Sequence, residues 1–110
     1  MTMQLNLRYM QALAKHVAPK YDIRTYLSSV LVEINDERRH YVATDGHIMA
    51  VLVEPRQDSD TNGQYVLERT DILRIKPFGS LDTVGFDFDG LVAKLQYAGS
   101  TLTTTLIDCR

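Results

Sequence analysis

The sequence repeats one plan of secondary structure, and this repeat limits the fold more than any other feature. Each half predicts a short strand, a helix and then three strands, and the second half starts about 60 residues after the first. Residues 4–8 (QLNLR) are echoed by residues 64–68 (QYVLE). A single copy could not cover its own sheet, so two copies related by a pseudo-twofold axis are needed to close a core.

In the first half, apolar side chains at Leu7, Met10, Leu13, Ala14 and Val17 follow the spacing of a helix that Pro19 should stop. Alternating apolar residues then predict strands at 30–34, 41–44 and 47–53. Turns are expected at residues 35–37 and at Asp45–Gly46. The polar stretch 55–63 (PRQDSDTNG) is interpreted as a connector between the halves.

The second half predicts a strand at 64–67, a helix from about Arg69 to Lys76 closed by Pro77, and strands at 84–89, 91–97 and 101–107. We therefore expect one domain over residues 1–110, with repeat halves of about 1–56 and 63–110. Its class is α+β, with two helices side by side on one face of antiparallel sheets. The residues expected to be buried between these layers are Leu7, Met10, Leu13, Val17, Ile72 and Ile75, packed against Val30, Val32, Val84 and Phe86.

Charge excludes a protein that coats nucleic acid with its whole surface, because the formal net charge is −2 and the sequence pI is about 5.8. Any DNA contact must come from a local face. One such face is predicted on the first helix, where Arg8, Gln11, Ala12 and Lys15 share a side and no acidic residue occurs from Leu7 through Lys20.

The sequence does not favour an enzyme. Histidines 16, 40 and 47 and the single Cys109 have no metal-ligand spacing, and no nucleotide-binding or nucleophile motif is present, so no metal, cofactor or catalytic residue is predicted. Asp87 and Asp89 are better explained as the wet side of a half-buried strand than as paired carboxylates. The lone cysteine, and the lack of a signal or of an apolar run long enough to cross a bilayer, favour a cytoplasmic protein without membrane contact.

Three segments carry a resemblance to a known family: residues 22–34 (DIRTYLSSVLVEI), 41–51 (YVATDGHIMAV) and 101–108 (TLTTTLID). They resemble the middle domain of the bacterial DNA polymerase III β sliding clamp, with ATDGH between two strands the most specific part. The resemblance implies the DNA-clamp fold. Clamps of that family carry three such domains per chain and close a ring of six domains around DNA, with helices lining the hole. Whether this single domain stands alone or is a piece of a longer chain stays open.

The resemblance implies a weak, sequence-independent contact with double-stranded DNA through the helix side of the domain. The basic residues that stand where such clamps are positive are Arg8, Lys15, Lys20, Arg24, Arg69, Arg74 and Lys76. Point charges that face phosphates without reading base edges would let the protein slide. The alternative is that these side chains belong to ordinary solvated helix faces.

The resemblance also implies one wall of a pocket for short hydrophobic peptides of replication proteins. The matching positions are Leu27, Thr44, Gly46, His47, Ile48 and Met49, and Ile48 departs from the basic residue common in the family. The family completes this pocket with a further domain, so only half a groove is expected here. The alternative is a tight turn that carries a surface histidine.

Two functions follow from the resemblance. In the first, copies of the domain associate through edge strands into a ring that tethers replication proteins and gives processivity. In the second, a monomeric or dimeric adaptor or decoy occupies clamp-binding peptides without encircling DNA. An enzyme is the third and least supported class.

Overall fold

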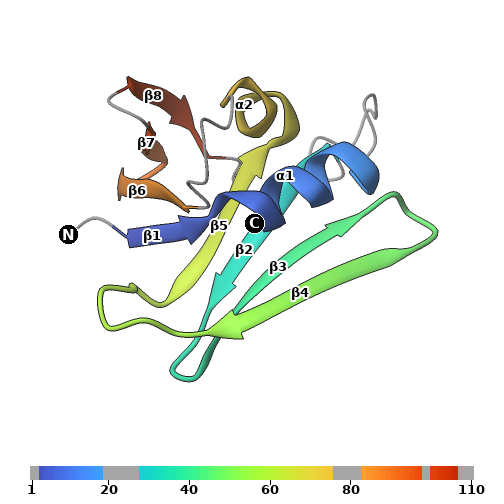
Figure 1. The fold of residues 1–110 in the computed structure, drawn as a ribbon, viewed down its shortest axis with the longest axis horizontal. Helices are drawn as coiled ribbons and strands as arrows, with labels where there is room; N and C mark the ends of the chain where they lie inside the picture. Colours follow the sequence, from blue (N-terminus) through green and yellow to red (C-terminus); the bar gives the residue numbers. More distant parts are fainter. Residues whose placement is uncertain (1–2, 19–27, 76–82, 98–99, 107–110) are drawn as a thin grey trace.

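The computed structural model describes residues 3–18, 28–75, 83–97 and 100–106, and it confirms the repeated plan (Figure 1). The first half contains β1 (Met3–Asn6), α1 (Leu7–His16), β2 (Ser29–Ile34), β3 (Arg38–Thr44) and β4 (Met49–Pro55). The second half contains β5 (Gly63–Glu68), α2 (Arg69–Arg74), β6 (Thr83–Asp89), β7 (Val92–Tyr97) and β8 (Ser100–Thr105). The order strand, helix, three strands therefore occurs twice.

The two halves exchange their first strands. One sheet has the order β1-β6-β7-β8 and the other has the order β4-β3-β2-β5, and every pairing is antiparallel. Each four-stranded sheet thus combines three strands of one repeat with the opening strand of the other. Neither half can complete its sheet without its partner, which makes the domain a single folding unit.

Local sequence explains where the helices begin and end. Asn6 caps α1, because its side-chain oxygen accepts a hydrogen bond from the Tyr9 amide at 3.0 Å. Helix α2 has no side-chain cap at Glu68 and is shorter than expected, since Ile75 already has extended backbone angles. The third strand begins at Met49 and not at His47, because residues 45–48 form a turn.

The core joins the inner faces of both sheets to the two helices. Helix α1 packs against α2, against β2 and β3 of one sheet and against β6 of the other, while α2 packs against β5. The aromatic ring of Tyr65 on β5 meets those of Phe86 and Phe88 on β6, with centroids 5.3 and 4.8 Å apart, so the two sheets are joined by aromatic contacts. Of the residues predicted to be buried, Leu7, Met10, Leu13, Ile72, Val30, Val32, Val84 and Phe86 are buried, while Val17 and Ile75 are partly buried.

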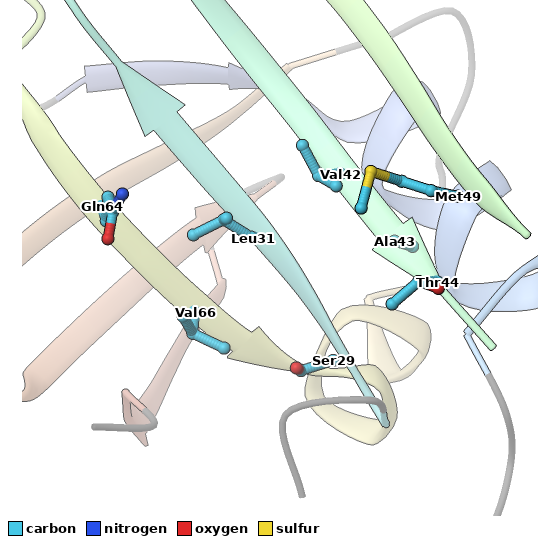
Figure 2. A pocket seen from close by; sticks show the side chains of 8 residues that line it. All are labelled: Ser29, Leu31, Val42, Ala43, Thr44, Met49, Gln64 and Val66. Carbon is cyan, nitrogen blue, oxygen red and sulfur yellow. The ribbon is translucent and has the colours of Figure 1, made fainter. Parts of the chain in front are cut away.

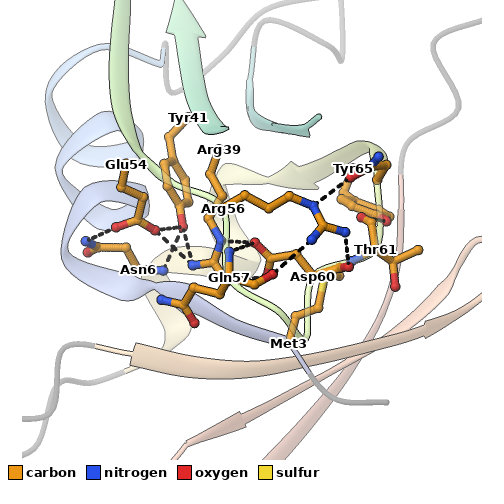
Figure 3. Close-up of polar contacts among 11 residues, drawn as sticks. Met3, Asn6, Arg39, Tyr41, Glu54, Arg56, Gln57, Asp60, Thr61 and Tyr65 are labelled. Atoms are coloured by element: carbon orange, nitrogen blue, oxygen red, sulfur yellow. Dashed lines mark hydrogen bonds and ion pairs between the residues drawn. The ribbon is translucent and has the colours of Figure 1, made fainter. Parts of the chain in front are cut away.

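A buried ionic cluster fixes the connector between the halves against the first sheet (Figure 3). Arg39 on β3 is 1% exposed; its Nε donates to Asp60 at 2.6 Å, a second nitrogen donates to the other oxygen of Asp60, and Nη1 donates to Glu54 at 2.9 Å. Tyr41 donates its hydroxyl to Glu54 at 2.6 Å and accepts the Asn6 amide at 2.9 Å. The cluster therefore links β3, β4 and the connector to the end of β1.

One cation in this cluster, Arg39, is shared by two carboxylates. Burial alone would raise the pKa of Asp60 and of Glu54, but hydrogen bonds from Arg39 to both carboxylates, and from Tyr41 to Glu54, hold each pKa below its usual value. Burial alone would lower the pKa of Arg39, and its two carboxylate partners raise it instead. All three groups stay ionised, so removing Arg39 leaves both carboxylates without the cation that they share.

We expect Arg39→Met to lower the free energy of unfolding by about 3–5 kcal/mol, because Asp60 and Glu54 lose their counter-charge inside the protein. Urea unfolding followed by circular dichroism measures the change. The matched control is Arg38→Met on the same strand, where the side chain is exposed and the loss should stay within about 0.5 kcal/mol. Equal losses for the two variants would contradict the assignment.

Candidate functional site

The two helices are held together by hydrogen bonds that each makes to the end of the other. Gln11 on α1 donates its side-chain amide to the carbonyl oxygens of Ile72 and Ile75, at 3.2 and 2.5 Å. In return, Arg69 at the start of α2 donates its Nε to the Ala14 carbonyl at 2.7 Å. These donors satisfy carbonyls near the end of each helix, so the helix pair has a fixed geometry.

The predicted DNA-contacting residues therefore divide into two roles. Arg8 and Lys15 on α1 and Arg74 on α2 have exposed side chains, and Arg74 lies 3.8 Å from Asp71. Arg69 is only partly exposed and is engaged in helix pairing. Three further predicted positions, Lys20, Arg24 and Lys76, lie outside the described residues.

Two acidic residues, Asp71 on α2 and Glu68 at the end of β5, lie near this basic set in the sequence. Asp71 is buried, and one of its oxygens accepts the hydroxyl of Thr104 on β8. Glu68 is the last residue of β5 and lies opposite Ser29 in the sheet register, on the face remote from the core. Arg8, Lys15 and Arg74 are exposed on α1 and α2, and Asp71 partly balances the charge of Arg74.

Residues 45–48 form a tight turn between β3 and β4. The Asp45 carboxylate accepts the amides of His47 and Ile48 at 2.8 and 2.9 Å, and these hydrogen bonds lower the pKa of Asp45. Thr44 donates its hydroxyl to the Ile48 carbonyl and accepts the Gly46 amide. Gly46 has a φ of 94°, which favours glycine. The turn is thus set by its own sequence.

A mostly apolar groove of about 370 Å³ lies beside this turn (Figure 2). It crosses the outer face of the β4-β3-β2-β5 sheet, with Met49 at one end and β5 at the other. The side chains that line it are Ser29, Leu31, Val42, Ala43, Thr44, Met49, Gln64 and Val66. Its volume is within the range of sites that hold small ligands or a few side chains.

The groove and the predicted pocket overlap only in part. Thr44 and Met49 line the groove, whereas Gly46, His47 and Ile48 are exposed in the turn and do not line it. Leu27 lies outside the described residues. Sequence reasoning missed Leu31, Val42 and Val66. The sequence could have indicated them, because these strands have apolar residues on both faces. A sheet with one face in water normally alternates apolar and polar residues.

Other kinds of site find little support in the described part of the chain. There, no group of three His, Cys, Asp or Glu side chains is placed to hold a metal ion. Neither of the helices seen in these ranges has the length and hydrophobicity needed to cross a bilayer. Asp87 and Asp89 are exposed on β6 while Phe86 is buried, as expected for the wet side of a strand.

Two repeats with exchanged opening strands and a paired set of helices are the features of the DNA-clamp fold. Solved structures with this fold include DNA polymerase III β chains of bacteria. The chain of Streptococcus pneumoniae TIGR4 matches with a TM-score of 0.80 and 14% identity, over 100% of this chain and 31% of that one. The β sliding clamp of C. crescentus matches with a TM-score of 0.77 and 19% identity, over 99% of this chain and 32% of that one. The β subunit of Thermotoga maritima matches with a TM-score of 0.75 and 14% identity, over 97% and 30% of the two chains.

The likeness is therefore to one domain of a longer protein, since this chain spans about a third of the length of the clamp chains that it matches. At these identities the match shows the fold. Compared by sequence, the chain matches no family model and no curated protein.

We expect Gly46→Ala to lower the free energy of unfolding by about 1–2 kcal/mol, because a side chain is strained at a φ of 94°. Thermal unfolding measures the loss. Gly90→Asn is the control, since Gly90 has a φ of 60° that asparagine tolerates and a side chain added there meets no neighbour. No loss in Gly46→Ala would mean that the turn is free to change its conformation.

Proposed function

We propose that this chain is a non-catalytic, sliding-clamp-like protein of DNA replication. In this function it contacts duplex DNA through α1 and α2 and tethers replication proteins through its outer surface. The observation that carries the proposal is the match of the whole chain to one domain of bacterial clamps, with a TM-score of 0.80. The exposed Arg8, Lys15 and Arg74 on the helix pair support it further.

The proposed DNA contact is electrostatic and independent of sequence. An exposed lysine or arginine attracts phosphates through water and displaces their counterions, and no such contact reads a base. The rigid pairing of α1 with α2 through Gln11 and Arg69 keeps the basic side chains in one arrangement. A contact of this kind is weak for one copy, which suits a protein that moves along DNA.

A ring requires several copies, because this chain supplies one domain where the matched clamp chains are about three times as long. Strands β4 and β8 lie at sheet edges and are paired on only one side among the described residues. On β4, Met49, Val51 and Val53 are exposed beside that edge, and the one charged residue of the strand, Glu54, is engaged with Arg39. We propose that β4 of one copy pairs with β8 of the next and that about six copies close a ring.

The alternative proposal is a monomeric or dimeric adaptor or decoy that binds clamp-interacting peptides without encircling DNA. The apolar groove beside Thr44 and Met49 supports a peptide site in either case. Ordering a flexible peptide offsets much of the free energy of burying two or three apolar side chains, so one copy should bind with a Kd of about 10–100 μM. A second copy that supplied the missing wall would tighten this binding.

We expect changing Arg8, Lys15 and Arg74 together to glutamate to reduce binding to a fluorescent DNA duplex at least about tenfold at low salt. Wild-type affinity should fall steeply with salt and show little sequence preference. The control is Arg38→Glu. Arg38 is exposed on β3, so the same change of charge is made in the sheet and not on the helices. Duplex binding that is unchanged in the triple variant would remove the helix face from the proposal.

Light scattering separates the two proposals. A ring predicts a particle of about six copies, with or without DNA, and the adaptor predicts one or two. In the ring, Val51→Lys with Val53→Lys should dissociate the assembly while circular dichroism stays native, because lysines beside an edge oppose strand pairing. A wild-type particle of one or two copies, unchanged by duplex DNA, would reject the ring.

A further inference from the structure

The outer face of the β4-β3-β2-β5 sheet carries a continuous row of aliphatic side chains. The strand register places Val51 opposite Val42, Val42 opposite Leu31, and Leu31 opposite Val66. Partners in an antiparallel register share a face, so these four side chains cross the whole sheet. This row extends well beyond the turn at residues 45–48, from which the site was first predicted.

A hollow lies alongside this row because the middle of the next row has two small side chains, Thr44 and Ser29. Met49 lies opposite Thr44, and Ser29 lies opposite Glu68. Ser29 is 3% exposed and is a small residue between bulkier neighbours. The resulting groove of about 370 Å³ is bounded by Leu31, Val42 and Val66 on one side. Such a space takes two or three aliphatic side chains of a ligand.

Charge differs between the two ends of the groove. Near β5, Glu68 is exposed beside Ser29, and Glu33 accepts the side-chain amide of Gln64 at 2.7 Å. Near β4, the groove ends at Met49, which is 67% exposed and uncharged. Of the described residues on this face, the basic ones are Arg38 and His40 on β3, which lie beyond Val42 on the side away from Met49, and His40 is opposite Glu33. The β5 end of the groove is therefore acidic and the β4 end is apolar.

We infer that this groove binds an extended peptide with two or three aliphatic side chains followed by a lysine or arginine. The aliphatic side chains occupy the hollow along Val42, Leu31 and Val66, and the basic group lies near Glu68 and Glu33. This inference rests on the proposed tethering function and names the chemistry of the tethered partner. It predicts selection for positive charge, because apolar burial supplies affinity and the complementary charge supplies specificity.

The test is an NMR titration of the full ¹⁵N-labelled chain with three peptides that share one leucine-rich core. The peptides end in two lysines, two glutamines or two glutamates. We expect the lysine peptide to shift the amides of Leu31, Val42, Thr44 and Val66 and to bind about fivefold more tightly than the glutamate peptide at low salt. The difference should shrink at 0.5 M salt, because screening weakens exposed charge pairs.

Two double variants test the acidic end and the apolar lining of the groove separately. Glu68→Gln with Glu33→Gln should remove the preference for lysine while the glutamine peptide still binds. Leu31→Gln with Val66→Gln should weaken all three peptides at least about fivefold. The control is Arg38→Gln, which changes a residue on the same face that does not line the groove. A preference for lysine that survives the double glutamate substitution overturns the charge assignment.

The remaining outcomes separate this inference from the proposed function. Equal binding of the lysine and glutamate peptides overturns the inference and leaves tethering in place. Shifts confined to residues 44–49 also overturn it, because the peptide would then occupy only the turn. Groove amides that broaden with protein concentration alone would mean that a second copy occupies the face. No shift with any peptide, in the monomer or in the assembled form, rejects peptide tethering and the inference together.

Discussion

The exchange of opening strands between the two halves is the constraint on which the rest of the structure depends. β1 completes the sheet of the second half, and β5 completes the sheet of the first. Each helix directly follows an exchanged strand, so the exchange also brings α1 and α2 together. Once the two helices lie side by side, Gln11 and Arg69 can each reach carbonyl groups of the opposite helix. The basic helix face is therefore a consequence of topology as much as of composition.

The cluster around Arg39 has a clear place in this scheme. A chain that exchanges strands needs a connector that returns from β4 at the edge of one sheet to β5 at its other edge. Arg39 binds Asp60 in the middle of that connector and Glu54 at the end of β4. Because Tyr41 also accepts the Asn6 amide, the same cluster touches the point where β1 becomes α1. A buried ionic group of this kind is suited to fixing one register rather than to adding stability.

The sequence predicted the parts of the fold that depend on local periodicity. The stripe of Leu7, Met10 and Leu13 defined α1, and the alternation around Val84 and Phe86 defined β6. The exchange of strands could not be predicted, since pairing partners are set by contacts between distant residues. Asp60 looked like an ordinary connector residue, and only the folded chain reveals it as the buried partner of Arg39. At the candidate site, Thr44 and Met49 of the predicted set both line the groove, while the groove along Leu31 and Val66 required the strand register.

The two faces of the domain complement one another under the proposed function. Lys15 and Arg74 on the helix side oppose a sheet face that carries Glu33 and Glu68, so an overall charge of −2 is compatible with a basic surface for DNA. Under the proposed function, Glu33 and Glu68 disfavour DNA at the β5 side of that face, because like charges repel. Each contact of one copy is weak, whether to phosphate or to peptide. In the proposed ring, assembly of several copies would multiply both contacts through effective concentration, which would keep the protein on DNA while each single contact exchanges quickly.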